Sequence, residues 1–528
     1  MQLNRLFSLM LIFFNTSSDA QVNINAPGQQ PEIIYHLFQR SFYDGNGDSQ
    51  GDLNGIISQL DYLQDLGVTS ILLLPLYQSV YYHNYFADDF EKIDEEYGSM
   101  QDFLHLVKAV HQRGMKIYLD METQYVTEDH VWWKDSYGNL KSKYADYILY
   151  DDTAHTKPST IVFGLNGLTG YNNTFKKITT VNLRSKKVLD YNFKLFKYFA
   201  DPNNDGKFDD GVDGFRLDHM MDTLDNKPEL ANLFSGFWTP LFTGLKKVNP
   251  NLQFIAEQAN WFSYGSEYFD KGNVDRVFAF GLQMAIASFD KKKIAETAAS
   301  TFNRTPAGRA QVVFIENHDM KRFASTVNNN PDKEKIGAAL NLLIGGIPSI
   351  YYGQELGMFG SGGFSKFNNT DGNDIPQREA FEWYKQDSGK GMAIWYKNSG
   401  PWWDSTNIKP DDGISFEEEK NDPNSLYNFY KTMIALHKTN KAIAYGDYVT
   451  IENNNKSVFT FMRSYKDEKV LVAINLSGSV QFADISPGQD KLLTRKMSSI
   501  YRNKEPENKS DVLSFELKPY AIEVWSAH

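Results

Sequence analysis

The chain has 528 residues and a formal net charge of −12 at pH 7. This length allows one large α/β barrel of about 250 residues together with one or two smaller domains. The acidic balance argues against a nucleic-acid partner, because a polyphosphate would be repelled on average, and favours a neutral ligand.

The first twenty residues have the organisation of an export signal. Arg5 gives a positive start, residues 6–14 form an apolar run, and residues 18–20 resemble a small-residue cleavage site. The run is shorter than the roughly 20 apolar residues of a membrane-spanning helix, and an N-terminal anchor is the alternative. We expect a signal peptide over 1–20 and a mature protein that is periplasmic or secreted, monomeric and without an integral membrane span. The sequence has no cysteine, which excludes disulfides.

Short apolar runs then alternate with longer segments of helical periodicity, a pattern typical of repeated βα units around a parallel sheet. Eight such strands favour the α/β class and a closed (β/α)8 TIM barrel over an open, doubly wound sheet. The expected strands are residues 33–37, 69–74, 116–120, 212–218, 253–257, 274–278, 312–316 and 349–352. The expected helices include residues 100–113, 185–199, 292–302, 333–343 and 426–438.

Two regions depart from the βα pattern. Residues 121–183 are polar and aromatic and too long for a simple loop, which predicts an inserted domain after the third strand. Beyond residue 445, short alternating runs between turn residues predict a C-terminal antiparallel β-sandwich domain. The predicted organisation is a signal peptide at 1–20, the catalytic barrel at 21–120 and 184–440, the inserted domain at 121–183 and the β domain at 441–528.

Acidic residues stand at the carboxyl ends of four predicted strands. Asp120 ends the third strand, Asp218 the fourth and Glu257 the fifth, and the seventh strand leads through Glu316 to Asp319. An acid directly after a buried apolar run is costly to keep there unless it is paired or hydrated. A single acid of this kind is as readily a structural cap or ion-pair partner. Four such acids are expected around the end of the barrel at which these folds place their active sites. Together they form a candidate active site.

Three of these segments carry motifs: Gly-Phe-Arg-Leu-Asp at 214–218, Ala-Glu at 256–257 and Asn-His-Asp at 317–319. In this order they resemble the α-amylase family, glycoside hydrolase family thirteen, and the resemblance covers nearly the whole chain after the leader. Supporting matches lie at 67–75, 82–85 and 346–355.

The resemblance implies a role for each matching residue. Asp218 would be the nucleophile, Glu257 the general acid and then base, and Asp319 the transition-state stabiliser. Further substrate contacts are implied for Arg216, His318, Tyr85, His83, Asp120, Tyr125 and Arg378.

The chemistry of a retaining glycosidase agrees with this assignment. Such an enzyme needs two carboxyl groups only about 5 to 5.5 Å apart, one ionised and one protonated. Arg216 shares a strand face with Asp218 and can keep that carboxylate charged. Crowding by two other carboxylates is expected to raise the pKa of Glu257, which suits an acid catalyst.

The chain departs from the family pattern at two places. Where the family usually has Asp-x-Val-x-Asn-His after the third strand, residues 120–125 read Asp-Met-Glu-Thr-Gln-Tyr, so Gln124 and Tyr125 replace the usual Asn and His. The Lys-His pair that often follows the nucleophile is Met221 and Asp222. These departures leave open how the sugars on either side of the cleaved bond are held.

An acidic loop after the first strand predicts a structural Ca²⁺ ion, with an ion-free turn as the alternative. It resembles the loop that the family carries there, and its oxygen-bearing residues alternate around glycines as in calcium loops. The expected ligands are Asp44, Asn46, Asp48, Gln50 and Asp52. Residues 201–210 have similar spacing but include Lys207 and lack a terminal Glu, so metal binding there stays open.

The leading hypothesis is an exported α-amylase that cleaves α-1,4-glucosidic bonds in starch or maltooligosaccharides. An α-glucosidase, or a transglycosylase or cyclomaltodextrinase on the same scaffold, is the alternative within the enzyme class. A glycan-binding protein that has lost catalysis is the alternative from another class. The sequence leaves endo or exo action, α-1,4 or α-1,6 preference and the balance between hydrolysis and transfer undecided.

Overall fold

The computed structural model describes residues 30–363, 365–485, 497–502, 506–509 and 512–527. The predicted signal peptide at 1–20 lies outside the described residues. Within the described part, no helix is both long enough and apolar enough to cross a membrane.

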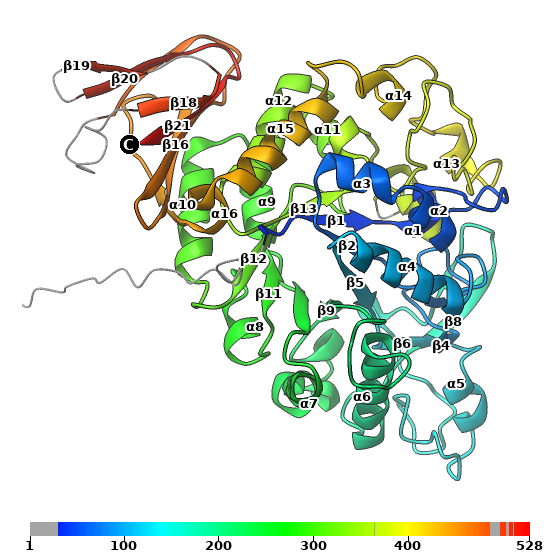
Figure 1. Ribbon diagram of the computed structural model, residues 1–528. Coiled ribbons are helices and arrows are strands. Elements are labelled where there is room, and N and C mark those ends of the chain that lie inside the picture. Colours follow the sequence, from blue (N-terminus) through cyan, green and yellow to red (C-terminus); the bar gives the residue numbers. More distant parts are fainter. Residues whose placement is uncertain (1–29, 364, 486–496, 503–505, 510–511, 528) are drawn as a thin grey trace, which may run out of the picture.

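Eight parallel strands close into a barrel in the order β1-β13-β12-β11-β10-β9-β5-β2, which confirms the predicted (β/α)8 fold (Figure 1). The strands are β1 (Ile34–Leu37), β2 (Ser70–Leu73), β5 (Lys116–Met121), β9 (Gly214–Met220), β10 (Gln253–Gln258), β11 (Arg276–Phe278), β12 (Ala310–Val313) and β13 (Ile347–Tyr351). The seventh strand of the barrel, β12, ends at Val313 and not at residue 316 as predicted. The chain turns away there because Glu316 accepts hydrogen bonds from Arg322 (2.8 Å) and from the backbone N–H of Phe323.

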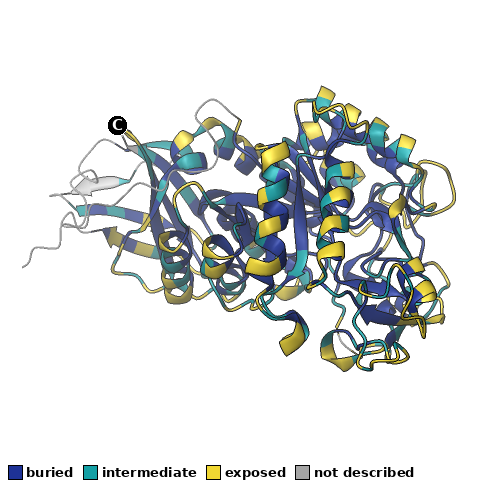
Figure 2. Ribbon diagram, turned by 90° about the horizontal axis from the view of Figure 1, so that it is seen from below, coloured by how far each residue is buried: buried dark blue, intermediate teal, exposed yellow. Residues whose placement is uncertain are grey.

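Amphipathic helices cover the barrel. In α4, the side chains of Phe103, Leu106, Val107 and Val110 are buried at i, i+3, i+4 and i+7, and Ser99 with Asp102 forms a capping box at its start. Figure 2 shows the barrel strands buried and the outer helix faces exposed. The longer helices are α4 (Met100–Gln112), α6 (Lys186–Ala200), α7 (Thr239–Val248), α10 (Lys291–Asn303), α12 (Pro331–Leu343) and α15 (Leu426–Thr439). The shorter ones are α1 (Gln39–Phe42), α2 (Leu53–Ser58), α3 (Leu60–Leu66), α5 (Val131–Ser136), α8 (Ser266–Asp270), α9 (Phe280–Ala287), α11 (Phe323–Thr326), α13 (Pro401–Asp404), α14 (Phe416–Glu419) and α16 (Lys441–Tyr445).

The barrel interior is a packed core. Ile34, Leu72, Ile255 and other apolar side chains of the barrel strands form one buried cluster. At the amino ends of the strands, Glu32 and Arg276 form a buried ion pair with oxygen-to-nitrogen distances of 2.9 and 2.8 Å. The interior is therefore filled by side chains and is not a channel, and folds of this kind place their sites beyond the carboxyl ends of the strands.

Two smaller β assemblies accompany the barrel. Between β5 and β9, the chain forms an antiparallel sheet in the order β6-β8-β7, and β3 pairs with β4 nearby. The C-terminal part has a five-stranded sheet, β14-β15-β16-β21-β18, and a three-stranded sheet, β17-β20-β19. Buried residues of both sheets, such as Leu471 and Leu513, share one cluster, as expected for a sandwich. The strands are β3 (Tyr77–Gln78), β4 (Asp89–Ile93), β6 (Tyr125–Thr127), β7 (Gly167–Thr169), β8 (Phe175–Thr180), β14 (Asp447–Thr450), β15 (Val458–Tyr465), β16 (Glu468–Asn475), β17 (Gln481–Ile485), β18 (Met497–Tyr501), β19 (Glu507–Lys509), β20 (Val512–Leu517) and β21 (Ile522–Ala527).

Candidate active site

One arginine holds three carboxyl groups at the carboxyl end of the barrel. The buried guanidinium of Arg216 donates from Nη1 to Asp120 at 2.7 and 2.9 Å and to Asp218 at 2.5 Å, and from Nη2 to Glu257 at 2.8 Å. These residues come from the neighbouring strands β5, β9 and β10. Because Asp218 and Glu257 bind two nitrogens of one guanidinium, their carboxyl groups lie close together, as a retaining glycosidase requires.

Asp218 and Glu257 have opposite protonation preferences. Burial raises the pKa of Asp218, but Arg216 and a hydrogen bond from Glu122 outweigh it and hold the pKa below its usual value. Burial, with the nearby charges of Asp218 and Asp319, raises the pKa of Glu257 well above its usual value despite Arg216. Asp218 is therefore the ionised group and Glu257 the protonated one, the division of roles that acid catalysis with a nucleophile needs.

A second group of polar residues surrounds Asp319. His318 Nε2 lies 3.1 Å from one Asp319 oxygen, and Arg378 Nη2 lies 3.2 Å from the other. Burial raises the pKa of Asp319, but His318 and Arg378 outweigh it and hold the carboxyl ionised. The Tyr85 ring stacks on His318, and its hydroxyl donates to Asp120 at 2.7 Å. Asp319 therefore lines the same cavity as Asp218 and Glu257, as a second anion.

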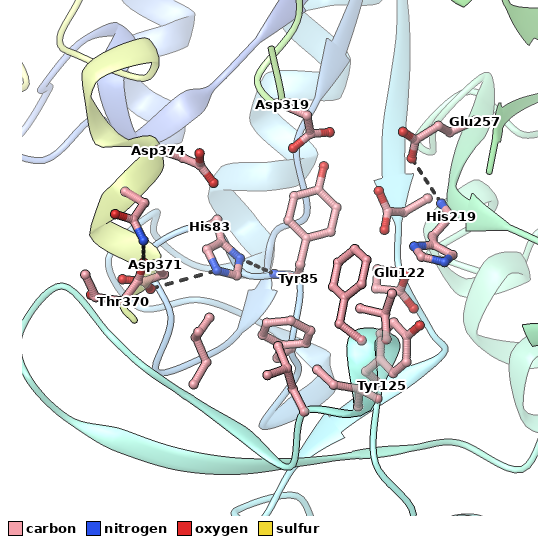
Figure 3. Close-up of a pocket in the computed structure, with 18 of the residues that line it drawn as sticks. His83, Tyr85, Glu122, Tyr125, His219, Glu257, Asp319, Thr370, Asp371 and Asp374 are labelled. Atoms are coloured by element: carbon pink, nitrogen blue, oxygen red, sulfur yellow. Dashed lines mark hydrogen bonds and ion pairs between the residues drawn. The ribbon is translucent and has the colours of Figure 1, made fainter. Parts of the chain in front are cut away.

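The three acids line one cavity of about 570 Å³ (Figure 3). Of the residues predicted to contact substrate, His83, Tyr85, Tyr125 and Arg378 line this cavity. Arg216, His318 and Asp120 are buried behind it and contact the lining acids. The structure thus brings all ten predicted catalytic and substrate-binding residues to one end of the barrel.

Several lining residues were not singled out from the sequence. Glu122, His219, Asp371 and Asp374 all contribute to the cavity. The signal for Glu122 was its position two residues after Asp120, because alternate residues of an extended strand share a face. Asp374, four residues before Arg378, lies 3.5 Å from its guanidinium. Asp371 is buried, one of its carboxylate oxygens lies 3.9 Å from Nε2 of His83, and burial raises its pKa to about 8.

The predicted calcium loop is a turn held together by hydrogen bonds between its own residues. The Asp44 carboxylate accepts the backbone N–H groups of Asn46, Gly47 and Ser49, and Asp48 accepts that of Gln50. The fifth predicted ligand, Asp52, caps α2 through the N–H of Gly55 at 2.7 Å. Among the described residues, no group of three acidic, His or Cys side chains is arranged to hold a metal ion. The oxygen donors suit calcium in kind, and calcium binding stays a prediction.

A closed parallel barrel with two carboxyl groups of opposite pKa shift on one arginine has the arrangement that a glycosidase needs. A model of the alpha-amylase catalytic domain matches residues 36–235 and 251–446, and the maltogenic amylase C-terminal domain matches residues 448–524. The chain belongs to the alpha-amylase family of glycoside hydrolases.

Relatives within the family have several activities. Alpha-amylase 3 of Dictyoglomus thermophilum is 29% identical over 462 residues, covering 86% of each chain. A probable oligo-1,6-glucosidase of Bacillus subtilis is 25% identical and covers 93% of this chain and 98% of its own. The 4-alpha-glucanotransferase of Thermotoga maritima is 27% identical, covering 84% of this chain and 96% of its own. Family membership therefore leaves the bond type open.

Solved structures share the architecture over most of the chain. The alpha-amylase from H. orenii matches with a TM-score of 0.77 and 25% identity, covering 95% of this chain and 100% of that one. A trehalulose synthase matches with a TM-score of 0.72 and 20% identity, covering 94% and 99%, and at that identity the match concerns the fold alone.

Proposed function

We propose that this chain is an exported, retaining α-glucan hydrolase of the α-amylase type that cleaves α-1,4-glucosidic bonds in starch or maltooligosaccharides. The single observation that carries the proposal is the Arg216 guanidinium, which holds Asp218 and Glu257 side by side. The opposite pKa shifts of these two carboxyl groups support it. An alpha-amylase among the similar proteins supports the bond type.

The reaction proceeds in two steps on these residues. Glu257 gives its proton to the glycosidic oxygen while Asp218 attacks the anomeric carbon, so the glycosidic bond breaks and a glucosyl ester forms on Asp218. Water then attacks the same carbon, Glu257 takes a proton from it, and Asp218 leaves as a carboxylate. Asp319, held ionised by His318 and Arg378, stabilises the positive charge that develops on the sugar ring in both steps.

The walls of the cavity suit a chain of sugars. Tyr85 provides a flat ring beside the three acids, and Trp261 lines the same cavity. Ile161, Val162 and Phe163 of the segment between β5 and β9 add an apolar wall. Phe163 is 84% exposed and has a positive φ of 61°, so its ring is free for a ligand although its backbone is strained. Such rings pack against the apolar faces of sugar units.

An α-glucosidase or transglycosylase is the second candidate, favoured by the oligo-1,6-glucosidase and glucanotransferase relatives. Products separate the two. On maltoheptaose and amylose, we expect mixed short oligosaccharides, with no action on isomaltose, and the first products should be α-anomers in a proton NMR time course. Glucose alone from maltose, attack on isomaltose, or longer transfer products would favour the second candidate, and β-anomers would contradict the retaining mechanism.

The calcium prediction has its own test. We expect EDTA to lower the melting temperature of the protein and added calcium to restore it, since a ligand at 100 times its Kd adds about 2.7 kcal/mol of stability. Asp48→Asn should remove this calcium response. Asp61→Asn, which changes an exposed acid outside both acidic loops, is the matched control and should keep it. A melting temperature that does not respond to EDTA would mean an ion-free loop.

A further inference from the structure

Glu122 is a buried acid that the three-carboxylate mechanism does not use. It directly follows β5, is 1% exposed and lines the catalytic cavity together with Asp218. In the family pattern Asp-x-Val-x-Asn-His, this position is a valine. Figure 3 shows Glu122 between Tyr125 and His219. A valine replaced by a buried acid at this place needs a physical reason, because an unpaired buried charge is unfavourable.

Gln124 connects Glu122 to the nucleophile. Its backbone N–H donates to Oε1 of Glu122, and its side-chain amide donates to Oε2 at 2.9 Å. The same amide donates to the backbone carbonyl of Asp218 at 2.8 Å. Tyr77 donates its hydroxyl to the Glu122 carbonyl at 2.6 Å and so holds the backbone of this segment. The Glu122 carboxyl is therefore fixed in orientation next to Asp218.

The Glu122 and Asp218 carboxyl groups are hydrogen-bonded to each other, so one of them carries a proton. Burial and the charge of Asp218 raise the pKa of Glu122 well above its usual value. Arg216 contacts Asp218, whereas no arginine, lysine or histidine among the described residues forms an ion pair with Glu122. The proton therefore resides on Glu122, which donates, and Asp218 accepts.

We propose that Glu122 is a positioning residue for the nucleophile, which as a neutral acid donates a hydrogen bond that orients the Asp218 carboxylate and stabilises its negative charge. The proposal rests on Asp218 being the nucleophile. The proposal explains why Glu122 replaces the valine of the family pattern. Glu122 adds a neutral hydrogen-bond donor next to the reacting carboxylate, which already has the positive charge of Arg216 beside it.

The hydrogen bond acts differently in the two steps. When Asp218 forms the ester with the anomeric carbon, it loses its charge, and the hydrogen bond from Glu122 weakens. When water displaces Asp218, the electron pair of the ester bond returns to the carboxylate and the hydrogen bond strengthens, while Glu122 keeps its proton throughout. Glu122 therefore makes Asp218 a weaker attacking group but a better leaving group, and favours hydrolysis of the ester.

Other charged or titratable groups also act on this pair, and the test has to separate their effect from that of Glu122. Two lie on β9 with Asp218, and the rest come from the elements packed around it. They are Arg216 and His219 on β9, Asp120 on β5, Glu257 on β10, Asp319 after β12, Tyr77 on β3, Tyr85 before β4 and Tyr125 on β6.

The test compares Glu122→Val, which removes the donor, with Glu122→Gln, which keeps an N–H donor of nearly the same shape. Without the hydrogen bond the pKa of Asp218 rises, so the acid limb of the kcat/KM profile should move to higher pH by about one unit in Glu122→Val. Glu122→Gln should return it to the wild-type position. Glu382→Gln, which changes a buried acid outside the cavity whose pKa is also raised by burial, is the control and should leave the limb in place.

The proposal is wrong if Glu122→Val lowers kcat or the melting temperature without moving the acid limb, or if Glu122→Gln moves it equally. Should Glu122→Val not fold, infrared difference spectra of wild type against Glu122→Gln provide the second measurement. We expect the stretch of a protonated carboxyl group at neutral pH in wild type, and its absence overturns the proposal. If Asp218→Asn is inactive and Glu122→Val leaves the acid limb unmoved, only this inference is refuted. If Asp218→Asn is active, the proposed function is refuted.

Discussion

Replacing Asp218 with Asn is expected to lower kcat on maltoheptaose by about 10⁴-fold or more while the protein stays folded. The amide cannot form the glucosyl ester, and the hydrogen bond that Arg216 donates to Oδ1 at 2.5 Å can still be accepted by the amide oxygen. The measurement is the initial rate of reducing-end release, with the melting temperature recorded on the same sample.

Two further variants sharpen this result. Asp61→Asn changes an exposed acid that pairs with Arg113 at the surface, and should leave the rate unchanged. In Asp218→Gly, azide should enter the space of the lost carboxylate and convert α-glucosyl fluoride into β-glucosyl azide. Undiminished hydrolysis by Asp218→Asn, or no azide product from Asp218→Gly, would count against Asp218 as the nucleophile.

Replacing Arg216 with Met is expected to reduce both stability and activity strongly. The change leaves Asp120, Asp218 and Glu257 buried without their shared cation, and breaking a buried ion pair typically costs about 3–5 kcal/mol. Because Arg216 lowers the pKa of Asp218, its removal raises that pKa, so the remaining activity should need a higher pH. Urea unfolding and the pH profile of kcat/KM measure the two effects.

A matched pair of variants separates charge from geometry. Arg216→Lys restores the charge but offers no fork that binds three carboxyl groups, so we expect partial recovery of stability and little recovery of rate. Arg184→Met changes an exposed arginine outside the site and should alter neither. If Arg216→Met kept the wild-type pH profile, the difference between the pKa values of Asp218 and Glu257 would not be caused by the guanidinium.

Much of the fold could be predicted because barrel strands are buried on both faces and read as short apolar runs. The run at 69–74, for example, contains β2, with all four of its residues buried. The end of the seventh strand was predicted wrongly because Phe314 and Ile315 continue the apolar run after the strand has ended. Only the contact of Glu316 with Arg322, six residues further on, shows where the chain turns away.

The sequence by itself determined the barrel, the antiparallel C-terminal domain and the family, because apolar periodicity and three short motifs are local patterns. It also indicated which acids meet, since strand ends converge at one rim. The tertiary structure alone decided that the Glu122 carboxyl group lies next to that of Asp218 and has a raised pKa, and that Asp371 is buried in the cavity wall beside His83. The reason is that a carboxyl group's charge depends on burial and on neighbours within a few ångströms, which come here from strands far apart in the chain.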